Sequence, residues 1–174
     1  MSTVQALADS GLRGRNLLRI ADLSPEEIVT ILSVADGLKR SRAADHLPLL
    51  RGKTLGMLFE KPSLRTRVSF EVGMTQLGGH ALIAHGSDFM VGARETPEDA
   101  ARVLSRFVDA IVVRTHAHEP LERFAAAATV PVVNACTTAP LFVSISAVAS
   151  RTSMPVIRLI SCRSASEALA NNCR

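Results

Sequence analysis

The sequence KTLGMLFEKPSLRTRVSFEVGMTQLGG, residues 53–79, gives the clearest indication of the fold of this chain. Its first part, Lys53 to Glu60, is a short and mostly apolar run, which predicts a buried strand. Its second part, Thr66 to Leu77, is long enough for a helix, and Gly78 and Gly79 follow it as a helix stop. A strand that passes directly into a helix is the repeating unit of a parallel α/β sheet.

The same alternation continues on both sides of this stretch. Short apolar runs predict further strands, and longer runs with apolar residues at helical spacing predict helices. The predicted strands are residues 81–84, 109–114 and 130–134, and the predicted helices are residues 24–39, 96–107 and 119–128. Strands with near-continuous Val, Ile and Leu are typical of sheets covered on both faces. The sequence therefore predicts an α/β fold, a parallel sheet flanked by helices.

Two of the predicted helices have clear start signals. Ser24 precedes a proline, and Glu27 completes a capping box three residues later. Thr96 also precedes a proline and is followed by two acidic residues, which favour the positive end of a helix. The helix that starts after Thr96 is predicted to bury a face made of Ala100, Val103, Leu104 and Phe107.

The composition indicates an ordinary globular chain. It has 174 residues, of which 47% are hydrophobic, so it is long enough to bury a sizeable core. No apolar run reaches the roughly 20 residues that a membrane span needs. Asp9, Arg13 and Arg15 interrupt the N-terminal part, which therefore has no secretory signal pattern. A cytoplasmic protein without a membrane partner is the default expectation.

The charge and the cysteines exclude several classes of function. Residues 1–135 carry 16 Lys and Arg against 15 Asp and Glu, so the sequence gives no electrostatic reason to expect a nucleic acid partner. The three cysteines, an odd number, all lie after residue 135, which argues against a disulfide scaffold. No C-x-x-C or H-E-x-x-H spacing occurs, so we expect no metal site and no cofactor.

Lys61, Arg65 and Arg67 lie close together where the first predicted strand ends. Like charges at such short range repel one another unless an anion or carboxylates compensate them. One interpretation is a solvated basic turn, in which Arg67 pairs with Glu71 at i+4 on the helix surface. The other interpretation is a phosphate site.

The positions of the polar residues favour the phosphate site. Ligands of parallel α/β sheets bind at the carboxyl ends of the strands, and both Arg65 and Arg114 follow such ends. A helix start offers free N–H groups, and the hydroxyls of Ser63 and Thr66 add donors. Arginine can place two parallel N–H bonds on phosphate oxygens, which lysine cannot. These residue types fit a small dianion, and no P-loop motif indicates a nucleotide.

Two stretches carry a family resemblance: FEKPSLRTRVSFEVGMTQLGG and GARETPEDAARVLSRFVDAIVVRT. They closely resemble the ornithine carbamoyltransferases, and the resemblance runs from about Asn16 to Ala135. The S-x-R-T-R element is common to the carbamoyltransferases. Lys61 and Pro62 before it and the EVGM sequence after it are similar to the ornithine branch rather than the aspartate branch.

The resemblance implies an architecture and a reaction. The family has two parallel α/β domains and assembles as trimers. The N-terminal domain, here residues 1–135, holds carbamoyl phosphate, and the second domain holds the amino acid. The implied reaction converts carbamoyl phosphate and L-ornithine to citrulline and phosphate, a step of arginine biosynthesis or urea-cycle type, without a metal, a cofactor or a covalent enzyme intermediate.

The resemblance also assigns residues by motif. Ser63, Leu64, Arg65 and Thr66 match the carbamoyl phosphate loop, with leucine where the family usually has threonine, and Arg114 matches an arginine that contacts the substrate. Arg65 and Arg114 are the residues expected to serve catalysis. The segment from Ser87 to Glu95 matches a loop that reaches into a neighbouring subunit's site. Met90 stands there where the family often has a polar residue, and a thioether is a poor hydrogen-bonding group.

The resemblance ends after Ala135. Residues 136–174 contain no H-P-x-Q element, which grips the carbamoyl group in the family, and no signature for the amino acid substrate. All ten glycines occur by Gly92, whereas arginine and serine become more frequent in the last 39 residues. We interpret residues 136–174 as an atypical tail that replaces the start of the ornithine-binding domain, through a frameshift, a truncated gene or a recombined end. A genuine divergent C-terminus is the alternative.

Three functions remain open at this point. The first is an ornithine carbamoyltransferase, present as its carbamoyl phosphate domain and inactive alone, which binds L-ornithine only if a second domain is supplied. The second is a carbamoyltransferase for another amine, such as an acylated ornithine or putrescine. The third is a non-catalytic remnant that associates with a complete enzyme.

Overall fold

The computed structural model describes residues 11–41, 48–85 and 95–135 of the chain. Strands and helices alternate along it after a first helix, as the sequence predicts. The elements are η1 (Ile20–Asp22), α2 (Pro25–Ser41), β1 (Thr54–Phe59), α3 (Leu64–Gln76), β2 (His80–His85), α5 (Pro97–Leu104), β3 (Ala110–Arg114), α6 (His118–Ala127) and β4 (Val132–Asn134). Helix α3 begins two residues earlier than predicted, at the second position of the S-x-R-T-R motif.

The four strands form one parallel sheet in the order β2-β1-β3-β4. The register pairs Phe59 at the end of β1 with His85 on one side and with Arg114 on the other. The carboxyl ends of the three strands therefore meet at the same edge of the sheet. This arrangement confirms the predicted α/β fold with a parallel sheet.

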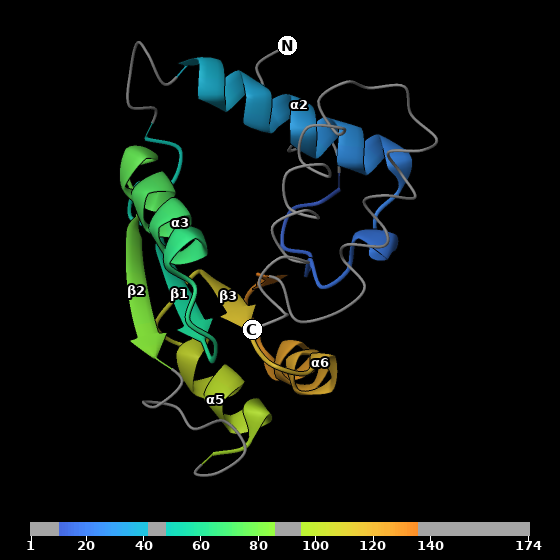
Figure 1. The fold of residues 1–174 in the computed structure, drawn as a ribbon, viewed down its shortest axis with the longest axis vertical. Coiled ribbons are helices and arrows are strands. Elements are labelled where there is room, and N and C mark those ends of the chain that lie inside the picture. Colours follow the sequence, from blue (N-terminus) through green and yellow to red (C-terminus); the bar gives the residue numbers. More distant parts are fainter. Residues whose placement is uncertain (1–10, 42–47, 86–94, 136–174) are drawn as a thin grey trace, which may run out of the picture.

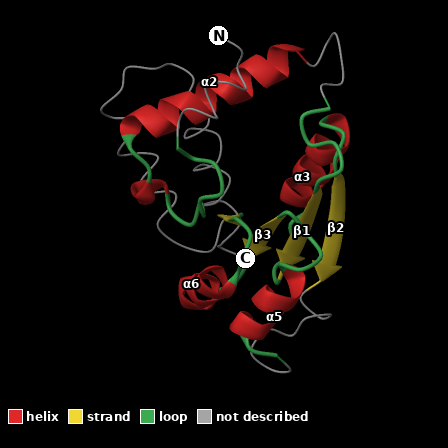
Figure 2. Cartoon of the chain, turned by 180° about the vertical axis from the view of Figure 1, so that it is seen from behind, coloured by secondary structure: helices red, strands yellow, loops and turns green. Residues whose placement is uncertain are grey.

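Helices cover both faces of the sheet, because alternate residues of each strand point to opposite sides. Leu58, Ile111 and Val132 face α5 and α6 and form one buried cluster with them. Met57 and Val112 face the opposite side and pack against α3 through Met74. Figures 1 and 2 show α5 and α6 together at one end of the molecule and α2 at the other.

The predicted helix starts are present. At α2, the Glu27 amide donates to Ser24 Oγ at 3.2 Å, and the Ser24 amide donates to Glu27 Oε2 at 2.8 Å, which together form the predicted capping box. At α5, the Asp99 amide donates to Thr96 Oγ1 at 3.2 Å. Both helix starts are therefore satisfied by their own side chains.

The predicted apolar face of α5 is partly wrong. Ala100 and Leu104 are buried as expected, but Val103 is 51% exposed and Phe107 is 73% exposed. The helix ends at Leu104, so Phe107 leaves the helical spacing that placed it on the face. Ala101 is fully buried instead of Val103 and Phe107, because a small side chain lets the helix lie close to the sheet.

One edge of the sheet is closed by the N-terminal segment. Leu17 forms a parallel bridge with Val133, with hydrogen bonds from Leu17 N to Val132 O at 2.8 Å and from Asn134 N to Leu17 O at 2.9 Å. The side chain of Asn16 accepts from Val132 N at 2.9 Å. The outer backbone groups of β4 are therefore paired rather than left open.

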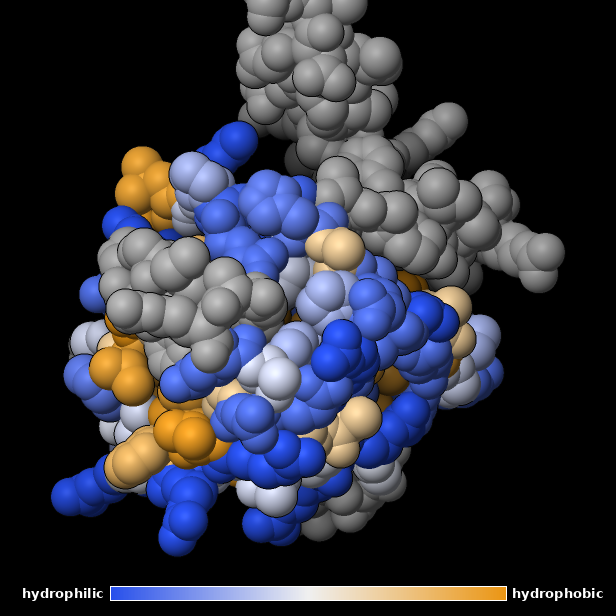
Figure 3. Space-filling model, turned by 90° about the horizontal axis from the view of Figure 1, so that it is seen from below, coloured by the Kyte–Doolittle hydropathy of each residue, from blue (hydrophilic) through white to orange (hydrophobic). Residues whose placement is uncertain are grey.

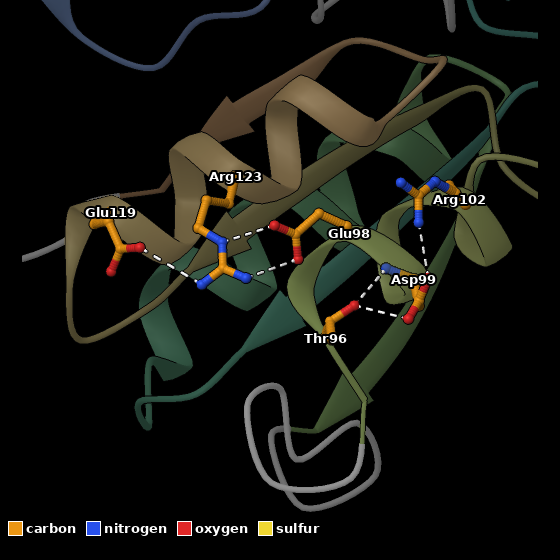
Figure 4. A network of polar contacts seen from close by, with 6 residues as sticks. All are labelled: Thr96, Glu98, Asp99, Arg102, Glu119 and Arg123. Atoms are coloured by element: carbon orange, nitrogen blue, oxygen red, sulfur yellow. Dashed lines mark hydrogen bonds and ion pairs between the residues drawn. The ribbon is translucent and has the colours of Figure 1, made fainter.

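Helices α5 and α6 are joined by ion pairs (Figure 4). Arg123 of α6 donates from Nε and Nη2 to the two carboxylate oxygens of Glu98, at 2.7 and 3.1 Å. Glu119 lies on the other side of the same guanidinium, at 3.5 Å. In α5, Arg102 pairs with Asp99 at 2.8 Å. The fork between Arg123 and Glu98 fixes the orientation of α6 against the start of α5.

Within the described part of the chain, no helix has the length and apolar character needed to cross a membrane. Met90, most of the predicted intersubunit loop and the whole of residues 136–174, with all three cysteines, lie outside the described residues. The predictions made for them stay predictions.

Candidate functional site

The start of α3 differs from the starts of α2 and α5. Ser63 is its N-cap residue, but the Ser63 hydroxyl accepts no hydrogen bond from the helix, and the first turn carries no acidic residue. The first helical bond runs from Arg67 N to Ser63 O at 3.0 Å, so the amides of residues 64–66 precede the helical ladder. These amides and the positive end of the helix dipole favour an anion.

Arg114 reaches this helix start from the neighbouring strand. Its Nη1 donates to Ser63 Oγ at 2.8 Å and lies 3.3 Å from Thr66 Oγ1. Ser63, Thr66 and Arg114 are all half-buried. Because a hydroxyl that accepts a hydrogen bond still carries its own proton, both hydroxyls remain able to donate to a ligand. The structure thus brings together three of the predicted site residues.

One nitrogen of Arg114, Nε, is a buried hydrogen-bond donor without a partner among the described residues. Leaving a buried donor of a charged group unpaired is unfavourable, and such groups normally have a partner. An anion that accepts hydrogen bonds from the Arg114 guanidinium would compensate the buried charge.

Arg65 and Leu64 lie at the same turn but point toward solvent. The exposed fraction of Leu64 is 69%, and Arg65 is also exposed. Leu64 offers an anion only its backbone amide. The exposure of Arg65 leaves its guanidinium accessible at the open side of the turn, whereas Arg114 approaches from the sheet.

The alternative of a surface ion pair is not supported. No ion pair joins Arg67 to Glu71 in the described ranges, and Glu71 is exposed.

The described residues also contain no group of three His, Cys, Asp or Glu side chains that could hold a metal ion.

Sequence reasoning did not single out Glu60, although it lies directly beside this turn. The Glu60 amide donates to Arg114 O at 2.9 Å, and Glu60 Oε2 accepts from His116 N at 3.0 Å. The only signal in the sequence was its position as the last residue of the predicted strand, which the structure ends one residue earlier, at Phe59. Figure 3 views the molecule from the side toward which β1 and β2 run, and the described residues there are mostly hydrophilic with small separate apolar patches.

A parallel sheet with an uncapped, basic helix start at its carboxyl edge defines an α/β domain with a candidate anion site. Residues 15–140 match the family model described as aspartate/ornithine carbamoyltransferase, carbamoyl-P binding domain. The chain belongs to this family. The resemblance predicted from the S-x-R-T-R and EVGM elements is therefore confirmed.

Known relatives give the same result. The chain is 54% identical to the ornithine carbamoyltransferase of Halalkalibacterium halodurans over 129 residues. This alignment covers 74% of the chain and 40% of that protein. The structure of ornithine carbamoyltransferase from Pyrococcus furiosus superposes with a TM-score of 0.72 at 46% identity, over 79% of this chain and 45% of the other.

A solved member of the aspartate branch is also similar. The catalytic subunit of aspartate transcarbamoylase from M. jannaschii superposes with a TM-score of 0.66 at 32% identity, over 72% of this chain and 42% of the other. The chain thus spans about 40% of the length of the curated relatives it matches. The matched family range ends at residue 140, near the boundary predicted after Ala135, which stays a prediction.

Proposed function

We propose that this chain is the carbamoyl phosphate-binding part of an ornithine carbamoyltransferase. The observation that carries the proposal is the contact of Arg114 with Ser63 and Thr66 around a helix start that no side chain caps. In the proposed complex the phosphate accepts hydrogen bonds from the amides of residues 64–66, the two hydroxyls and the Arg114 guanidinium, while Arg65 adds positive charge from the solvent side.

The ornithine branch is favoured over the aspartate branch. The ornithine carbamoyltransferases named above are 46–54% identical to this chain, whereas the aspartate transcarbamoylase is 32% identical. In the proposed reaction the δ-amine of L-ornithine attacks the carbonyl carbon of carbamoyl phosphate. A C–N bond forms, the C–O bond to phosphate breaks, and the proton lost by the amine is taken up by the departing phosphate, which leaves as hydrogen phosphate. Orientation of the substrates and stabilisation of the negative charge on the departing phosphate would supply the rate enhancement.

The complete enzyme in this proposal contains a second domain and assembles as a trimer in the cytoplasm, serving arginine biosynthesis. An exposed apolar stripe on α3 supports self-association. Leu64, Val68 and Val72 recur every four residues along one side of the helix and are 69%, 44% and 41% exposed. Met90, in the segment predicted to reach a neighbouring subunit, is part of the same proposal.

Calorimetric titration with carbamoyl phosphate tests the site. Arg114→Lys keeps the charge but removes the fork of donors, and we expect it to weaken binding by about 1.5–3 kcal/mol. Arg65→Ala is expected to weaken binding as well. Arg106→Lys serves as the matched control, because Arg106 is exposed beyond α5 and should bind like the wild type. Equal affinity of Arg114→Lys and the wild type would reject the proposed site.

The two alternative functions, a carbamoyltransferase for another amine and a non-catalytic remnant, can each be tested. A carbamoyltransferase for another amine would share this site, since the described residues give no information on the acceptor. A complete enzyme reconstituted with a second domain would then prefer putrescine or an acylated ornithine. A non-catalytic remnant is distinguished by stable co-purification with a full-length partner.

A further inference from the structure

We propose that Glu60 is a positioning residue of the anion site: its side chain holds the exit of β3 where Arg114 reaches Ser63 and Thr66. The inference rests on the proposed function, because it concerns the geometry of the same site. Glu60 lies in the turn between β1 and α3, three residues before Ser63. In the sequence Glu60 therefore belongs to the β1–α3 turn that carries Ser63, but its contacts are with the end of β3 that carries Arg114.

Glu60 holds the end of β3 at two points. Its backbone amide donates to Arg114 O at 2.9 Å, which continues the β1–β3 pairing one residue beyond the strand. Its carboxylate oxygen Oε2 accepts from His116 N at 3.0 Å. The first contact is available to any residue except proline, whereas the second requires a side chain that accepts a hydrogen bond and reaches as far as glutamate.

The two contacts lie directly after the Cα atom from which the Arg114 side chain leaves, one on each side of Thr115. Arg114 must cross from β3 to the first turn of α3 to place Nη1 at 2.8 Å from Ser63 Oγ. If residues 115 and 116 rotate, the guanidinium moves away from this position. A displacement of about 1 Å is enough to weaken a preorganised site strongly. The Glu60 carboxylate therefore maintains the geometry of the site without touching the ligand.

The same two strands carry a comparable contact at their opposite end. Asp109, directly before β3, donates from its amide to Thr54 O at 2.8 Å and accepts from Thr54 N at 2.8 Å through Oδ2. Asp109 also pairs with Lys53. It thus joins β1 to β3 much as Glu60 does, but at the amino edge of the sheet and away from the anion site. A substitution at Asp109 therefore serves as a control: it should disturb the pairing of β1 with β3 without disturbing the anion site.

An alternative role for Glu60 is to balance the positive charges of Lys61, Arg65 and Arg114. Two substitutions distinguish reach from charge. Glu60→Gln keeps the length and an acceptor oxygen but removes the charge. Glu60→Asp keeps the charge but shortens the side chain by one methylene, so it does not reach His116 N. If charge alone mattered, Glu60→Gln would bind a phosphate ligand more tightly, because a nearby negative charge is removed.

The experiment is calorimetric titration of the whole chain with carbamoyl phosphate, with thermal unfolding measured for each variant. We expect Glu60→Asp to bind about tenfold more weakly than the wild type and Glu60→Gln to bind within about twofold of it. Asp109→Ala is expected to lower the unfolding temperature without changing the affinity. Because both substitutions at Glu60 are close in size to glutamate, they should leave the fold intact.

Each other outcome counts against the inference. If Glu60→Asp binds like the wild type, or if Glu60→Gln binds more tightly, the carboxylate does not position Arg114. If Asp109→Ala weakens binding as much as Glu60→Asp, general strand pairing explains the effect and the specific role is wrong. If the wild type itself gives no binding heat, both the proposed function and this inference are rejected, whereas wild-type binding with an unaffected Glu60→Asp rejects the inference alone.

Discussion

Gly79 lies where the turn from α3 to β2 leaves no space for a side chain. A Cβ atom at this position would lie 2.6 Å from Met74 Cε and 3.0 Å from the carbonyl oxygens of Leu50 and Lys53. The Met74 side chain can move, but the two backbone oxygens cannot do so without disturbing the entry to β1. The neighbouring Gly78 has φ +80°, which ends the helix in the left-handed region that glycine favours.

Two glycine substitutions should therefore have opposite effects. Gly79→Ala is expected to lower the free energy of unfolding by about 1–3 kcal/mol through overpacking. Gly73→Ala, in the interior of α3, is expected to raise it by about 0.5–1 kcal/mol, because the added Cβ meets no atom within 4 Å apart from its own helix backbone and alanine is the better helix former. Urea unfolding of both variants measures the difference. Stabilisation by Gly79→Ala would contradict the described turn.

At the scale of elements, the contact between α5 and α6 depends on ionised carboxylates. The hydrogen bond from Arg123 lowers the pKa of Glu98, and a hydrogen bond from its own backbone amide lowers this pKa further. The pKa of Asp109 is also lowered, first by the hydrogen bond from Lys53 and then by that from the Thr54 amide. A carboxyl group with a lowered pKa binds its proton less tightly in the folded state than in the unfolded state.

The sign of the pH effect follows from this difference. The stabilisation is present above the unfolded-state pKa of a glutamate, about 4.3, and is lost as the pH falls through the lower folded-state pKa. We expect the urea midpoint of the wild type to decrease below about pH 4 and Glu98→Gln to show a shallower decrease. Glu71→Gln, which leaves the Arg123–Glu98 fork intact, is the control and should follow the wild type. An unchanged slope for Glu98→Gln would show that the fork adds no acid-sensitive stability.

At the scale of the whole molecule, the described residues contain one half of the machinery that the proposed reaction needs. In the proposed site, Ser63, Thr66 and Arg114 would bind the carbamoyl phosphate, whereas none of the described residues is assigned to ornithine. We expect the purified 174-residue chain to produce little or no citrulline from carbamoyl phosphate and L-ornithine in a colorimetric assay. A complete ornithine carbamoyltransferase in parallel is the positive control. Sustained turnover by the chain alone would refute the prediction.

The parts of the fold that local chemistry determines were predictable from the sequence. The capping box of Ser24 and Glu27 and the cap of Thr96 have the predicted contacts, because each involves residues three apart. The continuous apolar runs gave the four strands, since only a sheet covered on both faces buries such runs. The proximity of Arg114 to the start of α3 followed from the rule that the carboxyl ends of parallel strands share an edge of the sheet.

The remaining features depend on contacts between distant residues. The burial of Ala101 in place of Val103 and Phe107 depends on how closely α5 approaches the sheet, which the helical period alone does not specify. The side-chain contact of Glu60 with His116 N spans 56 positions, and no local pattern marks it. The absence of a side-chain cap on Ser63 is likewise invisible in the sequence, where a serine before a helix is a typical cap.

The bridge between Leu17 and Val133 has a consequence for the order of events in the cell. The Asn16 side chain and the Val132 amide are 116 positions apart, so this seam closes only after almost all of the described chain has left the ribosome. Contacts of such long sequence separation slow the search for the native state, so we expect the pairing of residues 16–17 with residues 132–134 to be among the last contacts of the described residues to form during biosynthesis.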